Sequence, residues 1–180
     1  MKYELGSNSS SDILVSDIST WDDEKCSAKL VESVVASEIV ALLWILENKS
    51  LDQLKRTSMQ EALLLACTAG LLSHVYAFLD FGFSADFMSE TEETPISSAA
   101  AFGNDAIVSC LANRGVKLNT KPSVFSEEIR LIVKNCSSLT TADLIPCLDP
   151  SGELQLSGRV LQVARELGRH DVLEQIKEAW

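Results

Sequence analysis

Apolar residues in the middle of the chain form short stripes with helical spacing, and each stripe is followed by a glycine. Residues 62–67 are all apolar and precede Gly70, and a second stripe over residues 74–79 precedes Gly82. Spacings of three and four residues mark the buried face of a helix, and glycine tolerates the left-handed conformation that ends one. The pattern therefore predicts a pair of short helices with a tight turn after each.

The same pattern returns about 33 residues further along the chain, where Gly70 aligns with Gly103 and Gly82 with Gly115. The apolar positions that coincide at this offset are Ala66 with Ala99, Val75 with Val108, Leu63 with Ile96, Cys67 with Ala100 and Phe78 with Leu111. Residues 94–95, Thr-Pro, suit a helix start, because threonine can cap a helix and proline fits its first turn. A period of this length is typical of stacked structural repeats.

The second copy resembles the ankyrin repeat, a unit of about 33 residues with two helices and a turn. Residues 94–119, TPISSAAAFGNDAIVSCLANRGVKLN, follow the family pattern without a gap, and residues 62–86 follow it more weakly in the same register. The matched family positions are Thr94, Pro95, Ala99, Ala100, Gly103, Val108, Leu111, Gly115 and Asn119. Ser97 replaces the usual histidine, and Glu92 occupies the hairpin glycine position, where a distorted turn could result.

More degenerate copies flank these two. Residues 160–173 match the pattern again, and residues 127–158 leave room for one poor copy. We expect the first helix of that copy at 128–134 and the end of its second helix near Pro146. Residues 28–46 have the pattern of a capping helix pair at the N-terminal end.

Together these observations predict an all-α fold, an ankyrin-repeat solenoid of about 4 to 5 helix–turn–helix units over residues 25–180. Degenerate terminal repeats are expected, because their outer faces meet water. The alternatives are an unrelated helical bundle and a tetratricopeptide-like solenoid, and the Thr-Pro-Ile motif and the glycine spacing disfavour the second of these.

Acidic residues outnumber basic ones, and many lie near the N-terminus. The chain has 26 Asp and Glu against 15 Lys and Arg, a formal net charge of −11, while its 46% hydrophobic residues suffice for a sizeable core. Residues 1–24 hold one lysine and six carboxylates, a net charge of −5, which leaves −6 on residues 25–180. We expect an acidic, Ser-rich, disordered tail before the folded domain. The lack of clustered Lys and Arg disfavours nucleic acid and anionic membranes as partners.

The composition indicates an intracellular protein, cytoplasmic or nuclear. No apolar signal-peptide region follows the N-terminus, and the longest apolar run, residues 39–46, is far below the roughly 18–20 residues of a membrane span. Five cysteines without Cys-x-x-Cys pairs favour free thiols in a reducing compartment. We expect no metal and no other cofactor, since His74 and His170 have no cysteine at ligand spacing.

Within the tail, residues 11–17 (SDILVSD) form a short β-prone run between acidic residues. Three interpretations stay open. The run could add as a strand to the sheet edge of a partner, it could be part of a disordered solubilising arm, or the tail could lie against the first helix pair through Ile18 and Trp21.

The ankyrin resemblance implies which residues contact a partner, because hairpin tips and first helices line a concave face in that family. Together with the tip residue Phe87, the partner-binding positions are Met88, Glu90, Thr91, Glu93, Ala101 and Phe102, and one period earlier Lys55, Ser58, Gln60 and Ala69. In the following copy the register gives Lys121, Ser123, Val124, Ser126, Lys134 and Asn135. The tip joins apolar bulk to carboxylates, which favours a basic partner. Phe87 could instead fold back on its own hairpin, and Phe102 could fill a gap between repeats.

Catalysis is not expected from this sequence. Cys67 and Cys110 fall at core positions and His74 aligns with Ile107, so these groups are predicted to be structural. Motifs for a nucleophile elbow, a phosphate loop or a dinucleotide fold are missing. The sequence predicts a non-catalytic scaffold or adaptor that binds a protein partner, expected to be basic, on its concave face. The alternatives are an acidic inhibitor, immunity protein or dedicated chaperone, and a pathogen effector that binds a host protein.

Overall fold

The computed structural model describes residues 21–179, which contain ten α-helices and one short 3-10 helix, η1. In chain order the elements are α2 (Asp23–Val35), α3 (Ile39–Asn48), η1 (Leu51–Gln53), α4 (Arg56–Thr68), α5 (Leu72–Asp80), α6 (Pro95–Ala101), α7 (Asp105–Asn113), α8 (Pro122–Asn135), α9 (Ser138–Leu148), α10 (Leu156–Glu166) and α11 (His170–Ala179). These described residues include no β-strand, so the expected all-α class is confirmed for them. None of these helices has the length and apolar character needed to span a bilayer.

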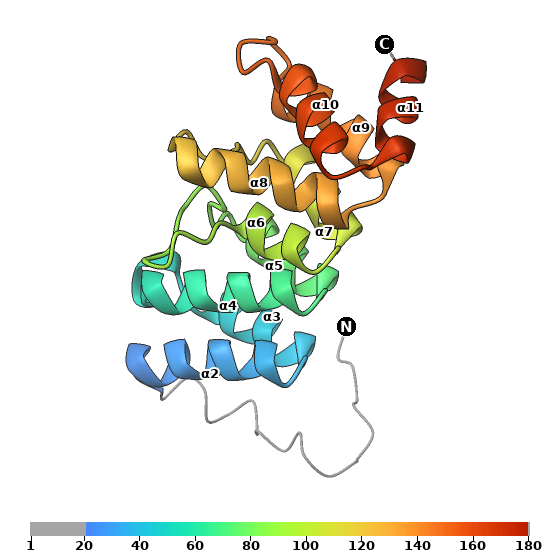
Figure 1. Cartoon of the computed structure of the whole chain (residues 1–180). Coiled ribbons are helices and arrows are strands. Elements are labelled where there is room, and N and C mark those ends of the chain that lie inside the picture. Colours follow the sequence, from blue (N-terminus) through green and yellow to red (C-terminus); the bar gives the residue numbers. More distant parts are fainter. Residues whose placement is uncertain (1–20, 180) are drawn as a thin grey trace.

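The helices pack as consecutive pairs that stack in two rows (Figure 1). We call the row of α2, α4, α6, α8 and α10 the front row, and the row of α3, α5, α7, α9 and α11 the rear row. Each helix contacts its pair partner and the next helix of its own row. The α2–α3 pair lies at one end of the stack and the α10–α11 pair at the other, so every other pair has two neighbours.

The rear helices begin at a regular interval. Helices α3, α5, α7 and α9 start at Ile39, Leu72, Asp105 and Ser138, so the same interval separates each start from the one before. This interval equals the one from Gly70 to Gly103. The start of α11 at His170 comes slightly earlier than the interval would place it. The offset found in the sequence is therefore also the offset between the rear helices.

The turns from α2 to α3, α4 to α5, α6 to α7 and α10 to α11 use the left-handed backbone region, whereas α8 is joined to α9 through Cys136 in an extended conformation. Gly70 and Gly103 have φ angles of 74° and 66°, as expected for glycines that end a helix. Ser37, one period before Gly70, adopts a φ of 58° in the equivalent turn although it carries a side chain. Such a conformation costs a non-glycine residue about 1–2 kcal/mol. The packing of the first helix pair therefore imposes this turn against the local preference of the serine.

Small side chains let the front helices approach one another closely. Ala62 and Ala66 on α4, and Ala99 and Ala100 on α6, are fully buried. Larger apolar side chains from both rows fill the space between them and form a single core cluster that involves every helix pair. The alanine positions of the repeat pattern thus lie where the front helices meet.

The connection into α8 differs from the expected hairpin. Helix α8 begins earlier than predicted, at Pro122, a residue that suits the first helical turn. Ser123, Val124 and Ser126 therefore lie on this helix, and their expected place at a hairpin tip is wrong. The reason is that Val124 is already part of the buried stripe of α8, which favours helix over hairpin.

Helix α9 continues past Pro146 to Leu148. A proline in the last turn of a helix removes only one backbone hydrogen bond.

The folded part of the chain starts before residue 25. Asp22 caps α2 by accepting a backbone hydrogen bond of 2.7 Å from its first turn, and Trp21 is buried with 9% of its surface exposed. The Lys49 side chain holds this end by donating to the Trp21 carbonyl at 3.0 Å. Residues 21–24, which the sequence analysis assigned to the tail, thus belong to the start of the fold. The rest of the predicted tail, residues 1–20 with the β-prone run, lies outside the described residues.

Candidate functional site

The loop between α5 and α6 carries the predicted tip residues. The ring of Phe87 has its centroid 6.0 Å from that of Phe83, which in turn lies 6.2 Å from that of Phe78. Phe87 is half-buried. It therefore folds back onto its own loop, which is the second of the two interpretations drawn from the sequence. The next residue, Met88, keeps 39% of its surface exposed.

Beyond the phenylalanine cluster the chain makes a tight turn that exposes carboxylates. The Ser89 N–H donates to the Glu93 carbonyl (2.8 Å), and the Glu92 N–H donates to the Ser89 carbonyl (3.0 Å). Glu92 takes a left-handed φ of 63°, so the turn closes although a glutamate stands where the ankyrin resemblance predicts a glycine. Its side chain forms an ion pair with Lys121. Glu90, Thr91, Glu92 and Glu93 are all exposed at the tip.

A buried carboxylate holds the base of this loop. Thr94 caps α6 in a capping box with Ser97, and its hydroxyl also donates to Glu128 Oε1 on α8 at 2.5 Å. The second oxygen, Oε2, accepts the Asn119 N–H at 2.8 Å. Glu128 is fully buried, and this burial raises the pKa of its carboxyl. No pattern in the sequence marks Glu128 as buried, because its partners Thr94 and Asn119 come from two separate segments of the chain.

Lys55, Ser58 and Gln60 lie at the N-terminal end of α4 and not on a hairpin tip. The Lys55 N–H donates to Ser27 Oγ at 2.9 Å, and its side chain pairs with Glu24, also at 2.9 Å. Ser58 and Gln60 are half-buried on the helix. Their predicted equivalence to the tip residues is therefore wrong in position, because α4 starts earlier in the period than α6 does.

The remaining predicted residues lie at the C-terminal ends of the front helices. Ala69 follows α4, Ala101 ends α6, and both are exposed. Phe102 has 66% of its surface exposed, so it fills no gap between helix pairs. Ala36, one period before Ala69, and its neighbour Val35, 70% exposed, extend this surface onto α2. We call these five residues, Val35, Ala36, Ala69, Ala101 and Phe102, the C-terminal strip, because they lie at the C-terminal ends of front helices. The period of 33 residues, applied once more toward the N-terminus, leads from Ala69 to Ala36 and so to its neighbour Val35.

Polar side chains from the following helix pair cap the ends of the front helices. The Asn104 side chain donates to the carbonyls of Cys67 and Thr68 at 2.7 and 3.1 Å. The Asn135 side chain donates to the Ala101 carbonyl at 3.2 Å. These bonds satisfy carbonyls that a helix C-terminus leaves free, and they hold the C-terminal strip in place.

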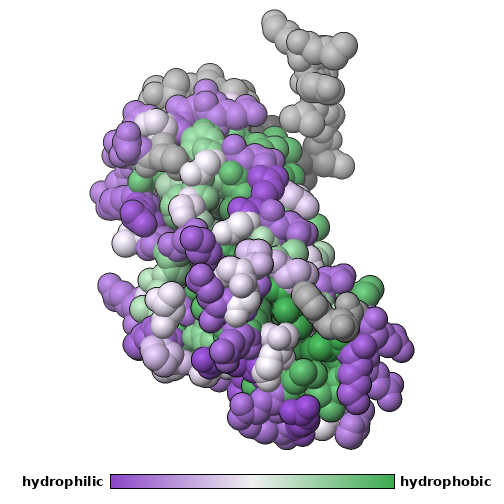
Figure 2. Space-filling model, turned by 90° about the horizontal axis from the view of Figure 1, so that it is seen from above, coloured by the Kyte–Doolittle hydropathy of each residue, from purple (hydrophilic) through white to green (hydrophobic). Residues whose placement is uncertain are grey.

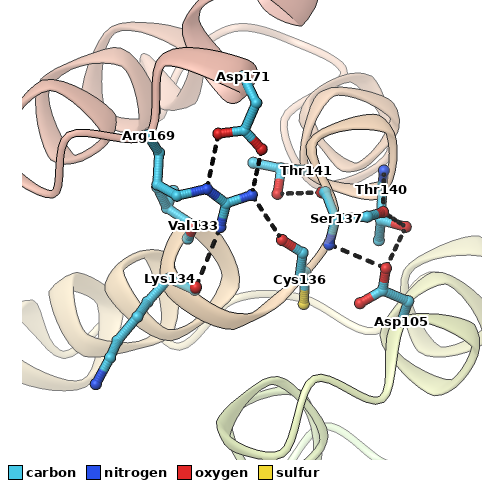
Figure 3. A network of polar contacts seen from close by, with 9 residues as sticks. All are labelled: Asp105, Val133, Lys134, Cys136, Ser137, Thr140, Thr141, Arg169 and Asp171. Atoms are coloured by element: carbon cyan, nitrogen blue, oxygen red, sulfur yellow. Dashed lines mark hydrogen bonds and ion pairs between the residues drawn. The ribbon is translucent and has the colours of Figure 1, made fainter.

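Arg169 has the same role at the end of α8 (Figure 3). Its guanidinium donates to the carbonyls of Val133, Lys134 and Cys136 at 2.6, 3.1 and 3.1 Å. Asp171 accepts two further hydrogen bonds from it, at 2.8 and 2.7 Å. Hydrogen bonding to Arg169 lowers the pKa of Asp171 to about 2. The loop before α11 is thereby tied to the end of α8.

A neighbouring carboxylate joins α7 to α9 (Figure 3). Asp105 Oδ2 accepts hydrogen bonds from the Ser137 N–H and the Thr140 hydroxyl, both at 3.0 Å. Ser137 in turn caps α9. The charged groups of both networks are engaged by partners inside the fold, which assigns them to holding successive helix pairs together.

The candidate nucleophiles and bases are mostly buried. Burial raises the pKa of the Cys67 and Cys136 thiols to about 12, so little thiolate forms at neutral pH. Cys67, Cys110 and His74 are buried, which confirms their predicted core positions. Burial lowers the pKa of His74, and its Nε2 has no hydrogen-bonding partner among the described residues. Within residues 21–179, no three His, Cys, Asp or Glu side chains gather in a way that could hold a metal ion.

The exposed surface is mixed in character. Seen from above the stack, hydrophobic residues emerge in several places between hydrophilic ones (Figure 2). Val40 and Leu139, two of the most exposed apolar side chains at 61% and 59%, lie on the rear row.

In comparisons with known proteins, no family model and no curated protein matches this chain. The function therefore has to be inferred from these surfaces.

Proposed function

We propose that this protein is a non-catalytic interaction module of the ankyrin-repeat type, which binds a protein partner on its front row. The observation that carries the proposal is the C-terminal strip, where Val35 and Phe102 expose 70% and 66% of their surfaces on front helices. Exposed apolar surface is typical of interaction sites, and aromatic residues are frequent anchors of interfaces. The front row can therefore bury Phe102 against a partner.

The spacing of the helices supports the repeat type. Four rear helices start at equal intervals of about 33 residues, which is the period of the ankyrin pattern. The left-handed turns at Ser37, Gly70 and Gly103 recur with the same period. Stacked repeats present extended surfaces that commonly bind other proteins.

The tip of the α5–α6 loop favours a basic partner. Glu90 and Glu93 are exposed and make no ion pair with a described residue, whereas Glu92 is paired with Lys121. The chain as a whole carries a net charge of −11. Such a field accelerates the association of a basic partner, and salt weakens the effect. The buried thiols and the buried His74 support a role without catalysis.

Affinity capture from the native cell, followed by matched variants, tests the proposal. Phe102→Ser removes the largest side chain of the C-terminal strip, and Leu139→Ser is the control, because Leu139 is similarly exposed on the rear row. Neither change should alter the free energy of unfolding by more than about 0.5 kcal/mol. We expect Phe102→Ser to weaken partner binding at least about tenfold, as at an interface hot spot, and Leu139→Ser to leave it unchanged.

A second pair of variants tests the charge at the tip. Glu93→Lys should slow the association of the partner at low salt, whereas Glu47→Lys, exposed on α3, should not. A captured partner whose binding survives both Phe102→Ser and Glu93→Lys, or is weakened equally by the controls, contradicts the assignment of the front row as the interface.

A further inference from the structure

A groove of about 630 Å³ opens beside the segment that joins α7 to α8. Residues 115–120 and Pro122 contribute to its lining, as do residues 147–151, Glu153 and Leu154. Its apolar lining comes from Val116, Leu118, Pro122, Phe125, Leu148 and Leu154. None of the tip residues and none of the C-terminal strip residues line this groove, so it is a separate feature of the surface.

The segment 116–120 runs beside the preceding loop and is tied to it by side-chain hydrogen bonds. The Lys117 N–H donates to Asp86 Oδ1 at 2.8 Å, and the Asn119 side chain reaches the Met88 sulfur at 3.6 Å. Burial along the segment alternates, with Lys117 exposed and Leu118 after it buried, as in a strand with one covered face. Two extended segments, separated by nearly one period of the chain, therefore lie side by side at the N-terminal ends of the front helices.

A third segment does not continue this row, because the chain turns away at the corresponding place. The Asp149 carboxylate accepts the N–H groups of Leu154 and Leu156 at 3.2 and 3.0 Å. Gly152, with a φ of 72°, lies in the turn between Asp149 and Leu154. The groove lies between this turn and residues 116–120, where a third extended segment would have continued the row.

The free edge of the row still offers backbone hydrogen bonds. The Leu118 N–H and the Leu118 carbonyl make no hydrogen bond to any described residue. In an extended chain the N–H and C=O groups of successive residues point to opposite sides. Since the Lys117 N–H points to Asp86, an extended backbone directs the two groups of Leu118 to the side opposite Asp86, and Leu118 lines the groove. Such an unpaired edge is a template for one more strand.

The groove also offers a cation. The Arg159 guanidinium lies over the Phe125 ring, 5.0 Å from its centroid, and its Nε donates to the Leu154 carbonyl at 3.2 Å. Its two terminal nitrogens have no hydrogen-bonding partner within the described part of the chain. Two carboxylates, Asp149 and Glu153, also line the groove. Asp149 is engaged by backbone N–H groups, and neither carboxylate forms an ion pair with Arg159. A carboxylate is the complementary group for the free edge of a guanidinium.

We propose that this groove binds an extended peptide segment of a partner protein as an added strand beside Leu118. The peptide backbone pairs with the Leu118 N–H and carbonyl, an apolar side chain lies against Phe125 and Leu154, and an acidic side chain binds Arg159. The site goes beyond the proposed front-row function, because it selects an apolar and acidic peptide, not a basic surface.

Selection of peptides on the intact protein tests this proposal. The probe is a phage-displayed library of random ten-residue peptides, and selected sequences are then made synthetically and measured by fluorescence anisotropy. We expect enrichment of peptides that combine a carboxylate with alternating apolar residues. Arg159→Glu should weaken their binding at least about tenfold, as should Cys147→Trp, which fills the groove from an exposed position in its lining. Arg165→Glu, exposed on the same helix outside the groove, is the matched control and should leave binding unchanged.

Backbone pairing has its own signature. Methylation of the peptide nitrogen that donates to the Leu118 carbonyl should weaken binding at least about tenfold, and methylation of the adjacent nitrogen should not, because alternate N–H groups point away from the edge. The proposal is overturned if selection enriches no peptide, if bound peptides keep their affinity for both groove variants, or if every N-methylation is tolerated. Phe102→Ser should leave peptide binding intact, so failure here is distinguishable from failure of the front-row interface.

Discussion

Replacing His74 by leucine should stabilise the protein. Its imidazole lies on α5 with 2% of its surface exposed, and its Nε2 is unpaired among the described residues. An unsatisfied buried polar group costs about 1–3 kcal/mol, and leucine removes that group. Ile107, one period later, is buried at 1% exposure, so an aliphatic side chain suits this column of the stack. Imperfect repacking takes back up to about 1.5 kcal/mol, and we expect a net gain of about 1 kcal/mol at pH 7.5.

The advantage of His74→Leu should grow as the pH falls. Burial lowers the pKa of His74 in the folded protein, whereas the imidazole of the unfolded chain takes up a proton near pH 6.5. Below that pH the unfolded state binds more protons, so the wild-type protein loses stability until the lowered folded pKa is reached. The slope is up to about 1.4 kcal/mol for each pH unit. The leucine variant lacks this proton uptake.

Urea unfolding followed by tryptophan fluorescence at pH 8, 7 and 6 measures both effects. His170→Leu is the control for the loss of a histidine, because His170 is exposed at the start of α11, and it should change the free energy of unfolding by less than about 0.5 kcal/mol. Two results together would refute the reasoning: a His74→Leu variant less stable than wild type at pH 8, and a stability difference that does not change between pH 8 and pH 6.

Three further changes test other parts of the fold by the same unfolding measurement. Ser37→Gly should gain about 0.5 kcal/mol, since relief of the left-handed strain exceeds the entropy cost of glycine; an equal gain from Ser37→Ala would show that strain is not the cause. Arg169→Ala should lose about 2 kcal/mol, because three carbonyls lose a charged donor, and Arg169→Lys should recover little of it; full recovery by lysine would contradict the role of the forked guanidinium. Glu128→Gln should be more stable than wild type at pH 8, and this gain should shrink as the pH falls. Burial raises the pKa of Glu128 in the folded state, so the cost of burying its ionised carboxylate appears only as the pH rises through that pKa. A gain in stability that is independent of pH would count against this explanation.

The predicted partner residues show how far the repeat pattern reaches. Ala69 and Phe102 were located correctly at helix ends, because the glycine that follows each of them marks the end of the helix in the sequence itself. Ser58 and Gln60 were misplaced, because the start of α4 is set by which residues it buries and not by the period. Patterns that mark where a helix ends were therefore more reliable than a register carried across a loop.

Buried polar groups could not be predicted from local sequence. Glu128 looks like a surface glutamate next to Glu127, yet it is fully buried and bonded to Thr94 and Asn119. Arg169 follows a turn glycine, as Asn104 does, but its target carbonyls lie at the end of α8 in the preceding helix pair, far away along the chain. The partners of such groups are close only in the folded chain, and an isolated burial without them would be unfavourable.

By itself, the sequence determined the helical class and the regular spacing of the rear helices. Apolar stripes, capping residues and turn glycines act over a few residues, so they can be read along the chain. Only the tertiary structure decided the early starts of α4 and α8, the left-handed Ser37 and Glu92, and the groove beside Leu118. The groove and the contacts at the start of α4 join segments far apart in the chain, where the free energy of burial outweighs the preference of the local residues.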